Sequence, residues 1–179
     1  MTPLPSVLVA GQKSKTFSPK TFSVWRLERR VHAPTWAQGI GAERVGGRWS
    51  PKGRPVIYTS LDPATTILEV AVHAGFEVLD TVPHQMLHIH ILKPDKVHVV
   101  QPEDIPNPYW RMPGAVSAGM QKFGSNLLDQ HPLVLLPSVV SKHSWNLLID
   151  VNSANDVFAL AEQEAFGLDG RLHPPKPGT

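Results

Sequence analysis

The stretch that decides the fold is GGRWSPKGRPVIYTSLDPATTILEVAVH, at residues 46–73. Inside it, the β-branched run at residues 55–59 predicts a short strand. Asp62 then supplies an N-cap and Pro63 the first helical position, so a helix should follow directly and run up to Gly75 as its C-terminal stop. Apolar residues nearly encircle this helix, which predicts that it is well buried. They are Ile67, Leu68, Val70, Ala71 and Val72.

Three polar side chains of this stretch suggest a nucleotide site. Arg48 follows two glycines, which let the backbone approach a ligand closely while the guanidinium offers a fork to a phosphate. Tyr58 ends the strand, where its ring can stack on a planar heterocycle. Glu69 lies on an otherwise apolar helix, where an ionised carboxylate is costly unless a cation or a hydrogen bond compensates it. The spacing alone leaves a second interpretation open, in which Arg48 and Glu69 form a structural ion pair and Tyr58 fills core.

The rest of the chain predicts more strands than helices, without regular alternation. The region 33–53 has five glycines and no periodicity, which predicts a long loop, and 102–113 predicts a second irregular connection. Residues 117–130 carry apolar side chains at helical spacing and predict a second helix. Strands are expected at 22–27, 86–92, 97–100, 133–140 and 145–151, and 156–166 is favoured as a strand over a helix. This order indicates a single α+β domain with a mixed or mainly antiparallel sheet and flanking helices.

Composition sets the class of protein. With 179 residues, 41% hydrophobic and 18% charged, the chain is expected to fold as one globular domain. We expect a flexible leader at 1–21, the domain at 22–172 and a short tail at 173–179. The absence of cysteine excludes disulfides, a thiolate nucleophile and thiolate-bound metals. No apolar run is long enough to span a membrane and no signal peptide is evident, so a cytoplasmic protein is expected.

Charge is divided unevenly along the chain. Residues 1–54 carry ten Lys or Arg against two Glu, whereas residues 55–179 carry seven against thirteen acids. The basic first third indicates either an anionic partner, such as a nucleic acid or a phosphorylated small molecule, or a solvated face.

Several separated motifs together resemble the RES domain, the toxin of a bacterial type II toxin–antitoxin pair. They are residues 46–73, LPSVV at 136–140, Asn146-Leu147-Leu148 and the stretch 166–172. The resemblance covers residues 22–172. The Arg, Glu and Ser that name the family would be Arg48, Glu69 and Ser138. The chain departs from the pattern at 146–152, where NLLIDVN stands in place of the expected Asn-x-Leu-Leu-Asn-Pro, so no role is assigned to these asparagines.

The resemblance implies a fold similar to ADP-ribosyltransferase toxins, with NAD+ as substrate and no permanently bound cofactor. Cleavage of the nicotinamide–ribose bond, by hydrolysis or phosphorolysis, develops positive charge on the ribose, which Glu69 would stabilise. Arg48 and Arg26, an arginine on the first strand, would hold the pyrophosphate. Tyr58 would stack near nicotinamide and Ser138 would bond the ribose or the amide.

The expected partner is a cognate Xre-type DNA-binding antitoxin that blocks the pocket. Two alternative functions stay open. In the first, the chain is a mono-ADP-ribosyltransferase that modifies a specific protein. In the second, it is a nucleic-acid-binding module that uses the basic first third. In the NAD+ interpretation, part of the basic charge would supply a field for the two phosphates. The residues concerned are Arg26, Arg44, Arg48, Lys52 and Arg54.

Four histidines lie close together in the sequence. His88 and His90 would share one face of a strand, with His84 and His98 nearby. Because no carboxylate in the same run and no cysteine accompanies them, we expect no metal site.

Overall fold

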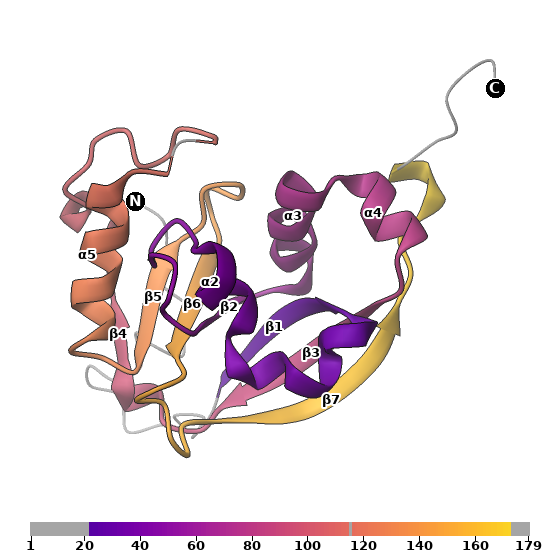
Figure 1. The fold of residues 1–179 in the computed structure, drawn as a ribbon, viewed down its shortest axis with the longest axis horizontal. Helices are drawn as coiled ribbons and strands as arrows, with labels where there is room; N and C mark the ends of the chain where they lie inside the picture. The colour runs from indigo at the N-terminus through magenta and orange to yellow at the C-terminus, as the bar shows by residue number, and fades with distance from the viewer. Residues whose placement is uncertain (1–21, 115, 173–179) are drawn as a thin grey trace, which may run out of the picture.

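The computed structural model describes residues 22–114 and 116–172, so the expected leader at 1–21 and tail at 173–179 lie outside the described residues. The described chain forms a seven-stranded sheet in the order β4-β5-β6-β2-β1-β3-β7 (Figure 1). Only β4 and β5 pair in parallel, and every other neighbouring pair is antiparallel. The predicted α+β class with a mixed sheet is therefore confirmed. The strands are β1 (Phe22–Arg29), β2 (Val56–Ser60), β3 (His84–Ile91), β4 (Val97–Val99), β5 (Leu133–Pro137), β6 (Trp145–Asp150) and β7 (Phe158–Phe166).

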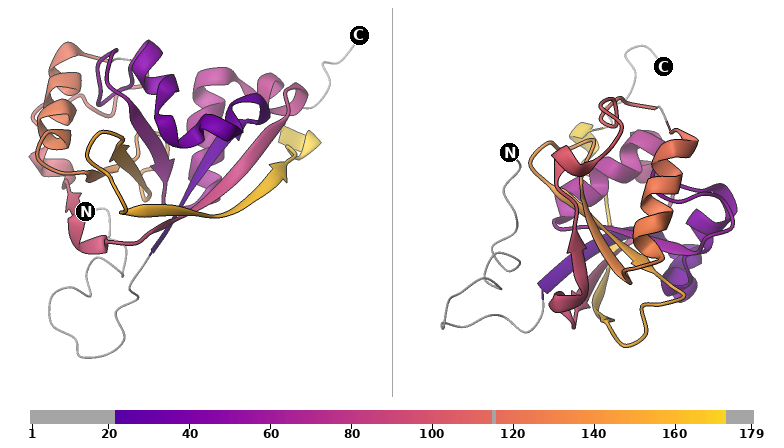
Figure 2. Two further views of the ribbon diagram at one scale, coloured as in Figure 1. Left: turned by 60° about the horizontal axis from the view of Figure 1, so that its bottom comes forward. Right: turned by 90° about the vertical axis from the view of Figure 1, so that its left-hand side faces the viewer.

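The sheet is strongly twisted. Apolar side chains are buried on both of its faces. Figure 2 shows β3 and β7 running across the direction of β5 and β6. The main core joins residues from both ends of the sheet, such as Leu87 and Ile89 of β3 with Leu135 of β5 and Leu147 of β6. On the opposite face, two smaller clusters lie under the helices. One is covered by α5 (Ala118–Leu128), and the other by α3 (Pro63–Ala74) and α4 (Phe76–Thr81).

Helix α3 begins and ends as its sequence predicts. Asp62 is the N-cap, and its Oδ1 accepts a 2.7 Å hydrogen bond from the amide of Thr65. Gly75 ends the helix with φ of 84°, a conformation that favours glycine. The prediction that the helix is well buried is wrong, because Leu68 is 41% exposed and Val72 is 60% exposed. The helix packs on the sheet along one side only, and that side carries two buried threonines in addition to apolar residues.

The predicted loop at 33–53 is also wrong in part. Its first half forms a 3-10 helix, η1 (Arg30–Gln38), and a short α2 (Ile40–Val45), which lie beside β2. Gly39 separates the two with φ of 66° and packs so closely that a Cβ atom would lie 2.6 Å from the amide nitrogen of Val56. Two of the glycines that indicate a loop in the sequence, Gly39 and Gly46, thus serve as helix ends. No helix in the described part of the chain is long and apolar enough to cross a membrane.

Candidate active site

Glu69 is the centre of a hydrogen-bonded cluster between α3 and the β5–β6 hairpin. Its side chain is half-buried, and its Oε1 accepts a 2.9 Å hydrogen bond from the hydroxyl of Ser138, the residue after β5. The same oxygen accepts a second hydrogen bond from Nδ2 of Asn146 in β6. These hydrogen bonds supply the compensation that a carboxylate on this helix requires.

Ser138 is oriented by the turn that it begins. Its hydroxyl oxygen accepts from the amide of Ser141 at 3.0 Å, and its own amide donates to the carbonyl of Ser144 at 3.0 Å. Because the hydroxyl proton goes to Glu69, Ser138 keeps only acceptor capacity for another group. Its role in binding the ribose or the amide of nicotinamide stays a prediction.

A second contact fastens the start of α3 to the same hairpin. The hydroxyl of Ser144 donates to Oδ2 of Asp62 at 2.6 Å, and Thr65 donates to the same carboxylate through both its amide and its hydroxyl. Burial by itself would raise the pKa of Asp62, but these hydrogen bonds outweigh it, and the pKa lies below its usual value. The helix that carries Glu69 is therefore bonded to the hairpin at two points, through Glu69 itself and through Asp62 at the start of the helix.

The glycine-rich loop lies directly on the ring of Tyr58. The Tyr58 hydroxyl shares a 2.9 Å hydrogen bond with Oγ of Ser50 and accepts one of 3.3 Å from the amide of Trp49. From the other side, Nε2 of Gln121 in α5 donates to the carbonyl of Gly47 at 3.0 Å. Burial raises the pKa of Tyr58, and the hydrogen bond with Ser50 opposes this only in part. The hydroxyl end of Tyr58 thus positions the loop that carries Arg48.

Arg48 reaches the connection between β4 and α5. Its Nη1 donates to the carbonyl of Trp110 at 3.0 Å and its Nη2 to that of Met112 at 3.5 Å. Burial lowers the pKa of Arg48, although the charge of Glu69 and the phenol of Tyr58 partly offset this. The structure therefore brings Arg48, Tyr58, Glu69 and Ser138 into one region of the molecule.

Arg26 lies elsewhere. Side chains alternate along a strand, and because Leu27 packs under α3, Arg26 points from the opposite face of β1. Its guanidinium forms an ion pair with Glu28 and donates to the backbone carbonyl of Tyr58 at 2.9 Å. Binding of a pyrophosphate by Arg26 stays a prediction, and it would require the side chain to leave Glu28.

Arg54 was expected to contribute to a phosphate-binding field, but the structure gives it another task. The guanidinium bonds to Asp129 at 2.5 Å and to Asp150 at 3.1 Å, and Asp150 is only 2% exposed. The two carboxylates outweigh burial and raise the pKa of Arg54. Its charge is therefore neutralised within the fold, whereas Arg44 and Lys52 are exposed.

The four histidines do not gather at one place, and Nδ1 of His84 lies 2.6 Å from the carbonyl oxygen of Val82. His88 stacks on Trp25 with ring centroids 4.9 Å apart, and His90 meets the edge of His88. His98 stacks on His131 at 4.2 Å, and burial lowers the pKa of His98. Within the described ranges, no group of three or more His, Cys, Asp or Glu residues is arranged to hold a metal ion.

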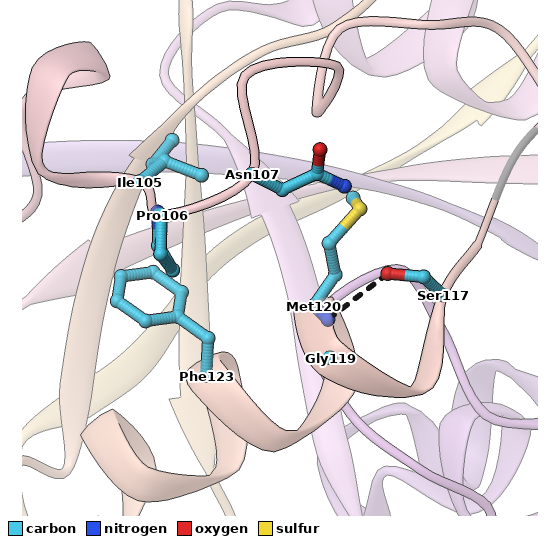
Figure 3. A pocket seen from close by; sticks show the side chains of 7 residues that line it. All are labelled: Ile105, Pro106, Asn107, Ser117, Gly119, Met120 and Phe123. Atoms are coloured by element: carbon cyan, nitrogen blue, oxygen red, sulfur yellow. Dashed lines mark hydrogen bonds between the residues drawn. The ribbon is translucent and has the colours of Figure 1, made fainter.

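An apolar pocket lies beside the N-terminal half of α5. It has a volume of about 310 Å³ and is lined by Ile105, Pro106, Asn107, Ser117, Gly119, Met120 and Phe123 (Figure 3). Figure 3 shows Ile105 and Pro106 facing the ring of Phe123, while Ser117 caps the helix by accepting from the amide of Met120. The connection that forms one wall of this pocket also supplies the carbonyls that bind Arg48.

Asn146 is the site residue that sequence reasoning missed. The segment 146–152 departs from the expected motif, which removed the reason to assign it a role. One signal was present in the sequence, because Asn146 interrupts the apolar residues of the strand predicted at 145–151. Only the pairing of β6 with β5 and β2 places it opposite Leu136 and Ser60 and under Glu69.

Comparison with known proteins identifies related chains. A family model described as RES domain matches residues 23–173. Toxin Res of Pseudomonas putida is 31% identical over 80% of this chain and 97% of its own length, and Toxin Res of Yersinia enterocolitica is 30% identical over 80% and 94%. Among solved structures, the MbcT-MbcA toxin-antitoxin complex of M. tuberculosis matches with a TM-score of 0.66. Its identity is 18%, and the match covers 82% of this chain and 85% of that chain, so this likeness shows the fold.

Proposed function

The chain belongs to the RES domain family as a toxin of a toxin–antitoxin system, and from this premise we propose that it consumes NAD+ by cleaving the nicotinamide–ribose bond. The observation that carries the proposal is the single carboxylate of Glu69, held by two neutral donors, Ser138 and Asn146, within the electrostatic reach of Arg48.

One carboxylate suits this reaction. Nicotinamide leaves as a neutral molecule and needs no general acid, while the ribose develops the positive charge of an oxocarbenium ion. A carboxylate held close to that carbon stabilises the charge without rearrangement at the moment of reaction. Glu69 would also orient the incoming water, phosphate or protein nucleophile.

Arg48 would bind the diphosphate. Its guanidinium already donates to two backbone carbonyls, and a diphosphate oxygen is a stronger, charged acceptor that would take over these donors. Tyr58, whose side chain is only partly exposed, would stack near nicotinamide. The partner would be a cognate antitoxin of the Xre type that covers this region, and the toxin would act on NAD+ in the cytoplasm.

The alternative of a nucleic-acid-binding module loses support from the ion pairs. Arg26 and Arg54, two of the basic residues in the first third, are neutralised by Glu28 and by the pair Asp129 and Asp150. Transfer of ADP-ribose to a protein differs from hydrolysis and phosphorolysis only in the acceptor, and the experiment below separates the three.

The test is incubation of the purified chain with NAD+, with and without phosphate and with and without a cell lysate, followed by mass spectrometry. Nicotinamide with ADP-ribose identifies hydrolysis, ADP-ribose-1″-phosphate identifies phosphorolysis, and a protein adduct identifies transfer. Glu69→Gln should lower the rate by about 10²-fold or more, because it removes the charge but keeps the shape. Glu77→Gln, an exposed site on α4, is the control and should retain the full rate. If wild-type protein releases no nicotinamide under any of these conditions, the proposal is wrong.

A further inference from the structure

We propose that Asn146 is a positioning residue that, together with Ser138, occupies Oε1 of Glu69 and thereby reserves Oε2 for the substrate. This inference rests on the proposed NAD+ cleavage, because it assigns the two oxygens of Glu69 different tasks in that reaction.

The two oxygens of Glu69 have different surroundings. Oε1 accepts from Ser138 at 2.9 Å and from Asn146, and a carboxylate oxygen has two lone pairs, so its capacity is filled. Within residues 22–114 and 116–172, no hydrogen bond ends on Oε2. An oxygen that is already saturated cannot approach a developing cation as closely as one that is free.

The orientation of the Asn146 amide is determined by its neighbours. The hydroxyl of Ser60 donates to Oδ1 of Asn146 at 2.8 Å, which turns Nδ2 toward Glu69. The reverse orientation would bring Oδ1, an acceptor, against the carboxylate. Ser60 is 3% exposed and lies directly opposite Asn146 in the β2–β6 register, so the sheet itself holds the pair.

The arrangement restricts a side chain that is otherwise mobile. Glutamate has several accessible rotamers, and α3 leaves Glu69 half-buried. Ser138 lies in a turn, whereas Asn146 lies in the middle of a sheet. Asn146 is therefore the more rigid of the two donors, and its loss should affect the rate of the chemical step more than the binding of NAD+.

The decisive variant is Asn146→Asp, which replaces the side-chain amide by a carboxyl group of the same shape that can lose a proton. Two carboxyl groups in contact share one proton, and in that form the new group still donates to Glu69. As pH rises the shared proton is lost, and two negative charges face each other within the electrostatic reach of Arg48. We expect kcat of N146D to fall as pH rises, with a midpoint above the ordinary aspartate value of about 4.

Three further variants complete the test. Asn146→Ala should lower kcat by about 10-fold or more at every pH, with KM changed by less than about 3-fold, as expected of a lost orienting contact. Ser60→Ala, which only frees the amide to rotate, should give a smaller loss of kcat. Asn126→Asp, at an exposed position on α5, is the control and should behave as wild type. Wild-type kcat in Asn146→Ala and Ser60→Ala, or a pH profile of N146D parallel to wild type, would overturn the proposal.

A crystal structure of Asn146→Ala separates this inference from the proposed function. We expect Glu69 to leave its position or to occupy more than one rotamer, whether or not the protein cleaves NAD+. If wild type is inactive on NAD+ and Glu69 is nevertheless released, the proposed reaction fails while the positioning role stands. If Glu69 keeps a single, unchanged rotamer, the positioning role fails. Should Asn146→Ala not fold, the same comparison is made with Ser60→Ala.

Discussion

Gly47 lies so close to Tyr58 that a Cβ atom built on it would come 2.5 Å from the phenol oxygen and 2.7 Å from Cζ. The glycine therefore does more than allow a turn, because it lets the loop that carries Arg48 rest on the end of the ring. Tyr58 in turn bonds to Ser50 and Trp49 of that loop. The Arg of the family motif is positioned by the tyrosine ten residues later.

Gly47→Ala should destabilise the protein. Tyr58 and the loop must separate, and strain of this kind costs about 1–3 kcal/mol of the free energy of unfolding. Gly41→Ala is the matched control, because nothing lies within 4 Å of its added Cβ atom. It should be neutral or stabilise α2 by up to about 1 kcal/mol. Urea denaturation of both variants measures the difference, and equal stabilities would show that the loop can move freely from the ring.

Two glycines of α5 should respond in opposite directions. A Cβ atom on Gly124 would lie 2.1 Å from the carbonyl oxygen of Trp49, whereas the nearest atom to one on Gly119 is Oγ of Ser117 at 3.8 Å. Gly124→Ala must push α5 away from Trp49 and should cost about 3 kcal/mol. Gly119→Ala should instead gain about 0.5–1 kcal/mol through the better helix propensity of alanine. Thermal denaturation of both variants checks this, and a stable Gly124→Ala would contradict the close packing.

Arg54→Ala should affect stability more than substrate binding. The variant leaves Asp150, which is 2% exposed, without its cation, and an uncompensated buried charge costs about 3–5 kcal/mol. Arg171→Ala removes an ion pair with Asp169, but both partners are largely exposed and screened by solvent, so its effect on stability should be much smaller than that of Arg54→Ala. If Arg54→Ala instead raises the KM for NAD+ and leaves the stability unchanged, Arg54 contributes to phosphate binding, as expected from the sequence.

Asp62 should make stability depend on pH. Its pKa is lower in the folded protein than in the unfolded chain, so the stabilisation is complete at neutral pH and is lost as pH falls through the folded value. Asp62→Ala should cost about 1 kcal/mol at pH 7, and the difference from wild type should begin to shrink as pH falls below about 4, the ordinary aspartate value, and continue to shrink toward the lower folded pKa.

Ser117→Ala is the control for Asp62, because it removes the N-cap of α5, which carries no charge. Its cost should be the same at every pH. Urea denaturation between pH 3 and 7 compares the two caps, and an Asp62→Ala difference that is constant across this range would contradict the linkage.

Local chemistry in the sequence was sufficient to predict the elements around the site. The strand at 55–59, the Asp62 and Pro63 start of α3 and its end at Gly75 are all confirmed, because caps and breakers act on their immediate neighbours. The region 156–166 is a strand, as favoured. The helices at 30–45 were missed because the glycines that cap them here, Gly39 and Gly46, and the proline inside η1, Pro34, are residues that also mark loops.

Properties that depend on neighbours far along the chain were decided only by the tertiary structure. Which side of α3 is covered, and hence the exposure of Leu68 and Val72, follows from where the helix packs on the sheet. The same holds for Arg54, since the sequence shows its charge but not the two carboxylates that neutralise it.

The sequence by itself determined the class of the fold and the course of the chain around α3, since these follow from local propensities, and through the family motifs it offered Arg48, Glu69 and Ser138 as candidate site residues. The tertiary structure decided that Asn146 contacts Glu69. That contact joins residues 77 positions apart, and it exists only because the β2–β6 register places Asn146 opposite Ser60. A strand shifted by one residue would turn Asn146 to the other face of the sheet.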